Sequence, residues 1–315
     1  MLNIGIVGLG NIAQKAYLPV MREIEGVKWY PCSRNKENLK KVTSLFGRAV
    51  PCETIEELLQ FPLDGVFVHV ATAAHAGIVK QILEAGIPVY VDKPITADYE
   101  QTEALYRIAK ANNTFLMAGF NRRFAPKVQE MKKIPDKKRI LVEKNAIDEA
   151  ADMHFKLYDL FIHPLDTALY LMDGRPVKGS FYYKKDREQL EQVTVYLESL
   201  QEVAIASMNV TSGARREIIE VQSTGGTYSL QDLSELTIYQ GPDRIEDRFG
   251  SWETTLYKRG FVTIVQAFLS AIQTGGENPV SPYSSLLSHL ICNRIDTAKA
   301  SEGFLSFTLP EEFLE

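Results

Sequence analysis

The chain has 315 residues, of which 45% are hydrophobic and 24% charged, and its formal net charge at pH 7 is −5. This length exceeds one ordinary hydrophobic core and predicts two domains. The negative charge argues against nucleic acid as a main partner, and no apolar run is long enough to span a bilayer. Cys32, Cys52 and Cys292 show no C-x-x-C spacing, and no leader-like segment precedes the first strand. These features favour reduced thiols in a cytoplasmic protein without a metal site.

The first motif is a glycine-rich turn between a predicted strand and a predicted helix. Leu2–Val7 is rich in β-forming residues and is followed by Gly8-Leu9-Gly10-Asn11-Ile12-Ala13. This is the G-x-G-x-x-A form of the dinucleotide fingerprint in its proper context. Gly8 would allow a tight turn, Gly10 would let backbone N–H groups approach a pyrophosphate, and Ala13 would let helix and strand pack closely. The motif predicts a cofactor site at residues 8 and 10–13, and the alternative is a glycine-rich turn in an unrelated α/β protein.

The first ~120 residues alternate strand and helix patterns, as in a parallel sheet that is covered on both faces. Thr54 to Glu57 reads as a capping box that opens a short helix. Longer amphipathic helices are expected at Ala73–Ala85 and Asp98–Asn112. The predicted strands are Leu2–Val7, Val27–Cys32, Ala49–Cys52, Gly65–Val70, Val89–Asp92 and Phe115–Ala118. We therefore predict an α/β Rossmann dinucleotide-binding domain over residues 1–119.

The pattern changes after Gly119 to alternating runs without long intervening helices, which predicts an α+β domain over residues 120–315 with a largely antiparallel open sheet. The basic segment Lys127–Lys138 is interpreted as a solvated helix end and loop, not as a nucleic-acid patch. The predicted strands are Phe181–Lys184, Gln192–Glu198, Val203–Val210, Glu217–Gln222, Thr227–Leu230 and Leu236–Tyr239. The helices expected to cover this sheet are Pro164–Met172, Phe261–Gln273 and Pro282–Ala300.

The end of the second strand bears on the choice of cofactor. An acidic residue about 20 residues beyond the glycines ordinarily binds the adenine ribose hydroxyls. Here the strand ends in Cys32-Ser33-Arg34-Asn35-Lys36, without a carboxylate. Ser33 and Arg34 could hydrogen-bond and neutralise a 2′-phosphate. The sequence thus favours NADP, with NAD possible if Arg34 is an ordinary surface arginine. Cys32 is interpreted as a packing residue and not as a nucleophile.

Two further segments carry candidate catalytic side chains. Val91-Asp92-Lys93-Pro94 ends a predicted central strand, and ligands of open α/β sheets bind beyond such ends, so Lys93 could reach a substrate oxygen. Asp159 and His163 are four residues apart and would share a face if helical turns begin at Asp159. A carboxylate beside an imidazole fixes its tautomer and raises its basicity. The alternatives are a surface lysine, and a capping aspartate beside a structural histidine.

Together these residues resemble the Gfo/Idh/MocA family of oxidoreductases, and in particular its MviM-like branch. The resemblance spans essentially the whole chain. It rests on the fingerprint, on the pair Asp159 and His163, on Ala71-Thr72-Ala73-Ala74-His75, on Asp92-Lys93-Pro94 in place of the usual Glu-Lys-Pro, and on the segment from Gly119 to Pro126 that contains Asn121 and Arg122. Membership implies hydride transfer between NAD(P) and a carbonyl/alcohol pair, most often on a sugar or polyol, in a homodimer or homotetramer.

The resemblance also implies roles for individual residues. Lys93 would bind the substrate oxygen, His163 would act as general acid/base on it, and Asp159 would orient His163. The substrate site would comprise Lys93, Arg122, Asp159, Phe161 and His163. Cofactor contacts would come from the fingerprint, Ser33, Arg34, Ala71, Thr72, His75, Asp92, Lys93, Pro94, Asn121 and Arg122.

The chain departs from the family pattern near the histidine. Phe161 stands where a glycine is common, and His154, Phe155 and Tyr158 replace small residues upstream. This bulk leaves the substrate class open. Because fold does not fix function, the alternative is a non-catalytic dinucleotide-sensing regulator, although a sensor has no need of both Lys93 and His163. Family members that reduce tetrapyrroles, or that cleave glycosidic bonds through a transient oxidation, represent a third possibility.

Overall fold

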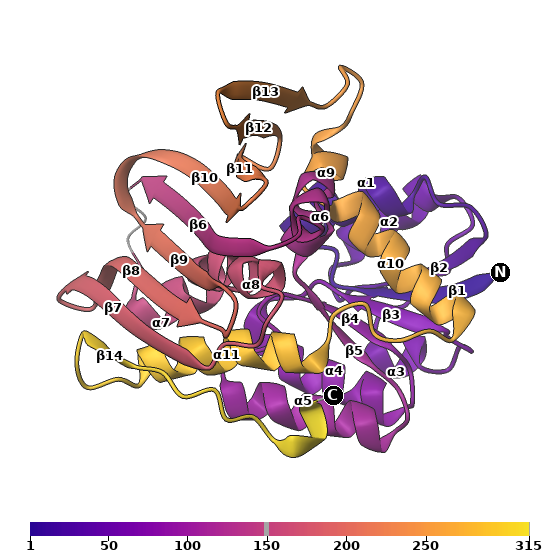
Figure 1. Cartoon of the computed structure of the whole chain (residues 1–315). Coiled ribbons are helices and arrows are strands. Elements are labelled where there is room, and N and C mark those ends of the chain that lie inside the picture. The colour runs from indigo at the N-terminus through magenta and orange to yellow at the C-terminus, as the bar shows by residue number, and fades with distance from the viewer. Residues whose placement is uncertain (148–150, 315) are drawn as a thin grey trace. The chain divides into compact units, whose positions relative to one another are not determined.

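The computed structural model describes residues 1–147 and 151–314 (Figure 1). The chain divides into two compact units. The first comprises Met1–Gly119 and Phe261–Pro282, and the second comprises Phe120–Gly260 and Tyr283–Glu315. The chain therefore leaves the first unit after β5 and returns to it for residues 261–282.

The first unit contains a parallel sheet with the strand order β2-β1-β3-β4-β5. The strands are β1 (Leu2–Val7), β2 (Val27–Cys32), β3 (Gly65–Val68), β4 (Val89–Asp92) and β5 (Leu116–Gly119). Most of their residues are buried, as expected for a parallel sheet with helices on both faces. The strand order reverses between β1 and β3, which is where doubly wound sheets bind ligands. The predicted Rossmann architecture is confirmed.

The predicted strand Ala49–Cys52 is reduced to an isolated bridge between Cys52 and Cys32 at the edge of this sheet. Val50 N donates to Trp29 O at 3.0 Å, and Cys52 N donates to Pro31 O at 2.9 Å. Pro51 has no N–H to donate and therefore favours a short edge segment over a full strand. Counted with this segment, the spatial order is that of a dinucleotide-binding fold, with the reversal beside β1.

Side-chain caps start several helices of the first unit. Asn35, Thr54 and Asp98 each accept a hydrogen bond from the backbone N–H three residues later, which satisfies a donor that the first turn leaves open. Figure 1 shows α2 on one side of the sheet and α4 and α5 on the other. The helices are η1 (Ala13–Tyr17, a π-helical turn), α1 (Leu18–Met21), α2 (Lys36–Phe46), α3 (Ile55–Leu58), α4 (Thr72–Glu84), α5 (Tyr99–Ala111) and α10 (Phe261–Thr274).

Helix α10 was expected to cover the antiparallel sheet, but it belongs to the first unit. The ring of Phe268 lies 4.7 Å from that of Phe67 and 5.8 Å from those of Tyr90 and Phe115, measured between centroids. A Cβ atom on Gly65 would come within 2.4 Å of Ile272, so the missing side chain lets the helix approach β3. Periodicity predicts an apolar helix face but does not indicate which sheet that face covers.

The second unit contains a largely antiparallel sheet, as predicted. Among the described residues nine strands pair in the order β13-β12-β11-β10-β6-β9-β8-β7-β14, and only β6 and β9 run parallel. Strands β6, β13 and β14 were not predicted, because they are strongly charged or very short. The strands are β6 (Lys137–Ile147), β7 (Lys178–Asp186), β8 (Gln189–Glu198), β9 (Val203–Asn209), β10 (Thr211–Ser223), β11 (Gly226–Gln231), β12 (Glu235–Gln240), β13 (Asp243–Arg248) and β14 (Glu302–Phe304).

Helix α8 (Ile162–Leu171) lies against β6 and β9, and Ser288 of α11 (Pro282–Asp296) donates to Asp166 of α8 at 3.1 Å. The other helical segments are η2 (Asn121–Phe124), α6 (Pro126–Lys132), α7 (Met153–Lys156), η3 (Leu157–Phe161, a π-helical turn), α9 (Thr255–Lys258) and η4 (Glu311–Phe313). Within the described ranges, no helix combines the length and apolar character needed to cross a bilayer.

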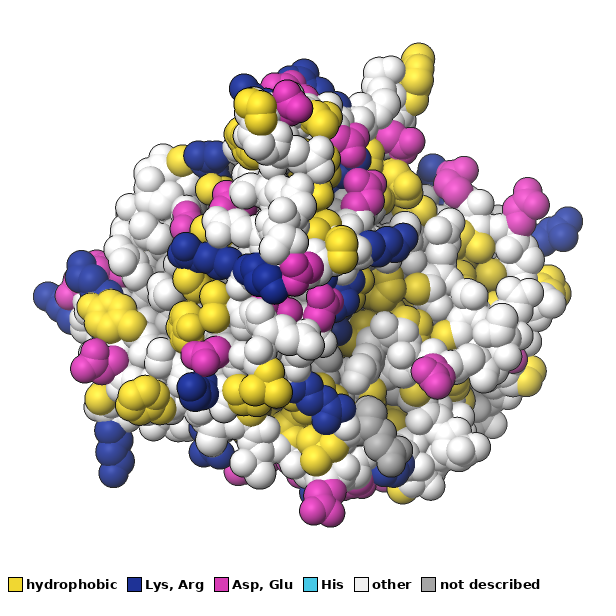
Figure 2. All heavy atoms as spheres, in the orientation of Figure 1, with side chains coloured by type: hydrophobic (Ala, Val, Ile, Leu, Met, Phe, Trp, Pro, Cys, Tyr) yellow, Lys and Arg dark blue, Asp and Glu magenta, His cyan; other side chains and the backbone are white. Residues whose placement is uncertain are grey.

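The basic segment Lys127–Lys138 contains most of α6 and the start of β6, and four of its five lysines are paired with acids. Lys127 lies 2.6 Å from Asp247, and Lys132 and Lys137 lie 3.1 and 2.8 Å from Asp173. On the face shown in Figure 2, Lys and Arg side chains are interspersed with Asp and Glu. This segment is therefore an ion-paired part of the fold and differs from the solvated loop that was predicted.

A buried histidine makes the stability of the second unit depend on pH. His289 is fully buried in α11, and its Nδ1 lies 2.8 Å from Ser285 O. Burial lowers the pKa of His289 to about 4. Because the unfolded chain takes up a proton below about pH 6.5 and the folded chain does not, stability is lost as the pH falls from 6.5 towards 4.

We expect the free energy of unfolding to fall by about 2 kcal/mol between about pH 7 and pH 5 through His289 alone. Urea unfolding at both pH values measures this loss. In His289→Gln the loss should be smaller by that amount, whereas His154→Gln, which alters an exposed histidine, should retain it. An equal loss in wild type and His289→Gln would contradict the assignment.

Candidate active site

The glycine-rich turn lies at the carboxyl end of β1, beside the point where the strand order reverses. Gly8 has φ +90°, and a Cβ atom there would lie 2.8 Å from the carbonyl of His69. A Cβ atom on Gly10 would meet nothing within 4 Å, and Ala13 is fully buried. The backbone thus requires Gly8, the close packing suits Ala13, and the open side of Gly10 has room for a pyrophosphate to approach. Asn11 and Ile12 are exposed at the same turn. These residues fit a dinucleotide.

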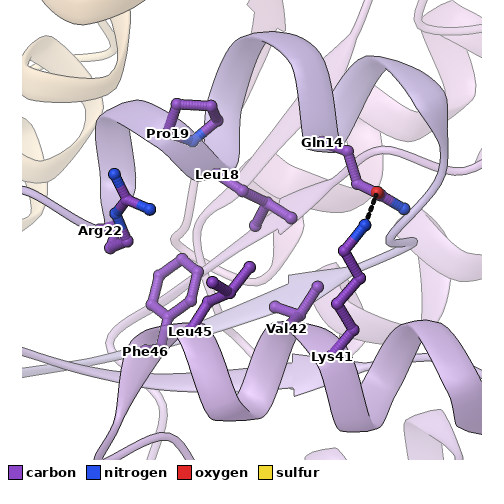
Figure 3. A pocket seen from close by; sticks show the side chains of 8 residues that line it. All are labelled: Gln14, Leu18, Pro19, Arg22, Lys41, Val42, Leu45 and Phe46. Atoms are coloured by element: carbon purple, nitrogen blue, oxygen red, sulfur yellow. Dashed lines mark hydrogen bonds between the residues drawn. The ribbon is translucent and has the colours of Figure 1, made fainter.

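Gln14 connects the turn to helix α2. Its Nε2 donates to Leu9 O at 2.9 Å. Its Oε1 accepts from Lys41 Nζ at 3.3 Å, the hydrogen bond that Figure 3 shows. The neighbouring pocket has a volume of about 190 Å³ and is lined by Leu18, Val42 and Phe46 among others. This volume is below the range of roughly 300–1,000 Å³ that is usual for ligand sites. The pocket is thus smaller than a usual ligand site, and we assign the two hydrogen bonds of Gln14 a structural role in holding the turn against α2.

Ser33 and Arg34 follow β2 directly. Arg34 is exposed, and Ser33 Oγ accepts a hydrogen bond from Asn35 N at 3.1 Å. Burial is the main cause that raises the pKa of the Cys32 thiol to about 12, so Cys32 is a protonated packing residue. This agrees with its interpretation from the sequence.

His75 joins the loops that follow β3 and β4. Its Nδ1 lies 3.0 Å from Pro94 O and 3.1 Å from Ile95 O, and its Nε2 lies 3.1 Å from Val70 O. At the start of α4, Ala71 is exposed and Thr72 is half-buried, whereas His75 is 1% exposed. His75 therefore supports the two loops with both ring nitrogens, and its contact with the cofactor stays a prediction.

Asp92, immediately before the half-buried Lys93, belongs to a cluster that was not predicted. His69 Nδ1 lies 2.9 Å from Asp92 Oδ2, and the ring of Tyr17 stacks on His69 at 4.0 Å. The Tyr17 hydroxyl lies 2.7 Å from that of Tyr90. Burial alone would raise the pKa of Asp92, but its interactions with His69 and Tyr17 outweigh burial and hold that pKa below its ordinary value. Asp92 is therefore a charged carboxylate anchored in the sheet, and it fixes the backbone that carries Lys93.

In the second unit, Arg122 joins His163 to a carboxylate on β10. Arg122 Nε and Nη2 donate to the two oxygens of Glu217, the latter at 2.8 Å, and Nη1 lies 2.6 Å from His163 Nδ1. All three side chains are buried. Burial alone would raise the pKa of Glu217, but the Arg122 guanidinium outweighs it and lowers that pKa. The pair therefore stays ionised.

The remaining predicted residues of the second unit have different surroundings. Asp159 is half-buried in η3, immediately before α8, and its pairing with His163 stays a prediction. Asn121 is buried, and its Nδ2 donates to Arg259 O at 2.8 Å, so this amide has a structural partner. Phe161 is fully buried, as is Tyr158, whereas Phe155 is exposed. The contact of Phe161 with substrate stays a prediction, and it would require the buried ring to become accessible.

Sequence reasoning missed His69 and Glu217, although both leave a signal. In β10 the period of two places Glu217 on the same buried face as Ile219 and Val221. His69 follows the fully buried strand β3 without a break. A titratable residue within an apolar pattern indicates a buried partner elsewhere in the fold. In neither case does the sequence show where that partner lies.

The sheet order, the glycine-rich turn and its open side define a dinucleotide-binding oxidoreductase fold. The family described as "Oxidoreductase family, NAD-binding Rossmann fold" (Gfo/Idh/MocA) matches residues 2–120, and the YceM-like C-terminal domain matches residues 126–241. The chain belongs to this family, which confirms the resemblance found in its sequence, and it is an NAD(P)-dependent oxidoreductase.

Three similar proteins illustrate this relationship. YceM of Salmonella typhimurium, which carries the name of an oxidoreductase, is 33% identical over 89% of this chain and 94% of its own. Inositol 2-dehydrogenase of Rhizobium meliloti is 25% identical over 68% of this chain and 72% of its own. The crystal structure of the dehydrogenase MviM from Clostridium difficile has 29% identity and a TM-score of 0.86, covering 94% of this chain and 98% of its own.

Proposed function

We propose that the chain transfers hydride between NADP(H) and a carbonyl/alcohol pair of a sugar, polyol or related small molecule. The observation that carries this proposal is the glycine-rich turn at the switch point of the sheet, with the anchored segment Asp92-Lys93-Pro94 following β4 of the same sheet. Both features lie beyond carboxyl ends of parallel strands, where such sheets bind ligands. Inositol 2-dehydrogenase among the relatives supports the polyol class.

The roles follow from the side chains. When bound, the nicotinamide supplies or accepts the hydride. The ammonium group of Lys93 would donate a hydrogen bond to the substrate oxygen and stabilise the charge that develops there. His163 would contact the same oxygen, with Asp159 beside it. Arg122 would reach the site only through His163, because its guanidinium is held by Glu217.

The preference for NADP rests on the residues after β2. Asn35, which caps α2, follows Ser33 and the exposed Arg34, and no carboxylate stands at the end of the strand. A guanidinium and a hydroxyl suit a 2′-phosphate, which a carboxylate would repel. Binding of NADPH in preference to NADH is therefore the expected property.

We expect Arg34→Asp to weaken NADPH binding by roughly tenfold to a hundredfold, because the substitution replaces an attractive charge with a repulsive one. NADH binding should change much less. Calorimetric titration of both variants with both cofactors measures these affinities. Lys15→Asp, which alters an exposed lysine of η1, serves as the charge control. Equal affinities of the wild type for the two cofactors would contradict the NADP proposal, and binding of neither would contradict the proposed function.

We propose further that the protein acts in the cytoplasm, which its three free cysteines support, and that it forms a homodimer or homotetramer. The support for an oligomer lies in the antiparallel sheet, where β7, β8 and β14 present aromatic side chains to solvent. Tyr182, Tyr196 and Phe304 are exposed there and line one shallow pocket. An exposed aromatic sheet face is a typical interface between identical subunits.

A further inference from the structure

We infer that the open edge of the antiparallel sheet is a docking surface for a second copy of this chain, and that the two β13 strands pair antiparallel about a two-fold axis at Ile245. This contact goes beyond the proposed function and does not depend on the proposed reaction. It is separate from the aromatic face, because β13 and β14 lie at opposite ends of the strand order. A tetramer needs a second contact of this kind in addition to a dimer interface.

Strand β13 leaves its outer edge open. Among the described strands it pairs only with β12, and Figure 1 shows it as the last strand beyond β11 and β12. Five of its six residues are exposed, and none is buried. An edge of this kind presents a row of unpaired backbone N–H and C=O groups to another strand.

The turn between β12 and β13 shows which backbone groups point outward. Asp243 follows a two-residue loop that begins with Gly241 at φ +57°, and it pairs with the residue before that loop. In such a hairpin the residues that flank the loop exchange both hydrogen bonds, and bonded and non-bonded pairs then alternate along the ladder. Ile245 therefore bonds to β12, whereas the N–H and C=O groups of Arg244 and Glu246 face the open edge.

An apolar row leads from the core of the second unit to this edge. The direct cross-strand partners are Val221 with Tyr228, Tyr228 with Ile238, and Ile238 with Ile245. Val221 is fully buried, Tyr228 and Ile238 are half-buried, and Ile245 is 48% exposed. Because directly opposed residues share a face, a second Ile245 opposite the first would continue the row into the other copy and cover both side chains.

Charge fixes where the two-fold axis passes. An axis normal to the sheet sets one residue of β13 opposite itself, and Ile245 is the one uncharged residue of this strand. With the axis at Ile245, Arg244 lies opposite Glu246 of the second copy, and Glu246 lies opposite Arg244. These two side chains share a face and are 3.1 Å apart within one chain. With the axis at a charged residue, like charges would be directly opposed, which destabilises a sheet.

The remaining charges of β13 are compatible with this register. On the face of Ile245, Asp243 would lie opposite Asp247 of the second copy. The ammonium group of Lys127 lies 2.6 Å from Asp247 and offsets this repulsion. Charged side chains on an edge strand ordinarily prevent non-specific pairing. In β13 both signs occur, so the same charges admit one register and disfavour its neighbours, which is how charge specifies a partner.

The first test is cross-linking of the full-length chain through one introduced cysteine, since the three native cysteines are buried. In Ile245→Cys, oxidised glutathione should produce a disulfide-linked dimer, because opposed residues of a non-bonded pair have Cα atoms about 4.5 Å apart, within disulfide range. Tyr239→Cys, on β12 with a similar exposure of 44%, should cross-link roughly tenfold more slowly. Equal rates, no cross-link in Ile245→Cys, or a faster cross-link in Glu246→Cys would overturn the inference.

The second test adds charge changes to Ile245→Cys. Glu246→Arg should slow the cross-link by roughly tenfold, because it sets arginine opposite Arg244. The further change Arg244→Glu should restore the rate, since it exchanges the two charges and renews their attraction. A rate that does not respond to Glu246→Arg would show random collision of exposed thiols and refute the pairing.

The third test is the size of the protein in sedimentation velocity, without an introduced cysteine. Glu246→Pro removes an outward N–H group and keeps the inward ladder to β12, so this variant should lose the edge contact and form a smaller assembly than the wild type. A wild-type assembly whose size is unchanged by Glu246→Pro would belong to the aromatic face and overturn the inference. None of these measurements needs cofactor or turnover, so failure of the proposed function is distinguishable from failure of this contact.

Discussion

Replacing Lys93 with methionine is expected to lower kcat by roughly a hundredfold or more, because the substrate oxygen loses the ammonium that stabilises its developing charge. Methionine has nearly the same length and apolar character as the lysine stem, so the loops after β3 and β4 should keep their contacts through His75. Binding of NADPH should therefore change little. Steady-state rates and a cofactor titration on the same preparation separate the two effects.

The matched control is Lys80→Met. Lys80 lies on α4 and forms an exposed pair with Glu84, with 56% of its side chain accessible. Lys80 is close to Lys93 in sequence but has no predicted part in the site. Removing its charge should therefore leave kcat unchanged. Near-normal turnover in Lys93→Met would show that Lys93 has no part in catalysis.

Replacing Asp166 with alanine should cost about 3–5 kcal/mol in the free energy of unfolding, because it removes the carboxylate that forms a buried, bidentate ion pair with the Arg123 guanidinium. Arg123 Nε donates to Asp166 Oδ2 at 2.8 Å, and Nη2 also donates to this carboxylate. Both residues are at least 95% buried, and Ser288 adds a further hydrogen bond from α11. The substitution thus removes the anion that holds η2, α8 and α11 together. Urea unfolding measures the loss.

Two further variants test the cause. Arg123→Met combined with Asp166→Leu removes both charges and should recover most of the stability, since an apolar pair avoids an unpaired buried charge. Glu246→Ala disrupts the exposed pair of Glu246 with Arg248 and should cost at most about 1 kcal/mol. If the double variant is as unstable as Asp166→Ala, the loss comes from packing and the electrostatic explanation is wrong.

Local patterns made most of the fold predictable. In the first unit the predicted strands at β1, β2 and β4 agree with the structure to the residue, since buried parallel strands read as short apolar runs between turn signals. The exceptions included the edge segment at Cys52 and the charged strand β6. Pro51 limits the first, and in the second Lys137 is buried in an ion pair with the distant Asp173. In both cases tertiary partners override the local pattern.

The candidate site likewise contains some features that could be predicted from the sequence and some that could not. Gly8 and Gly10 were predictable because their requirement is local, in the turn itself. The partnership of Arg122 with Glu217 joins residues 95 positions apart, and that of Asp92 with His69 joins two neighbouring strand ends. A single sequence shows that these residues are titratable but gives no sign of their contacts. The burial of Phe161 could not be predicted for the same reason, since it depends on the packing around α8.

The return of the chain to its first unit has a consequence for biosynthesis. Small domains ordinarily fold as units during translation, with the N-terminal domain first. Here the core around Phe67 and Tyr90 is closed by Phe268, and residues 261–282 belong to the N-terminal unit. When Gly119 leaves the ribosome, this unit still lacks one helix of its core and exposes the apolar surface that α10 later covers. The core of the N-terminal unit therefore cannot be completed until most of the second unit has been synthesised. During that interval we expect chaperones to bind its exposed apolar surface.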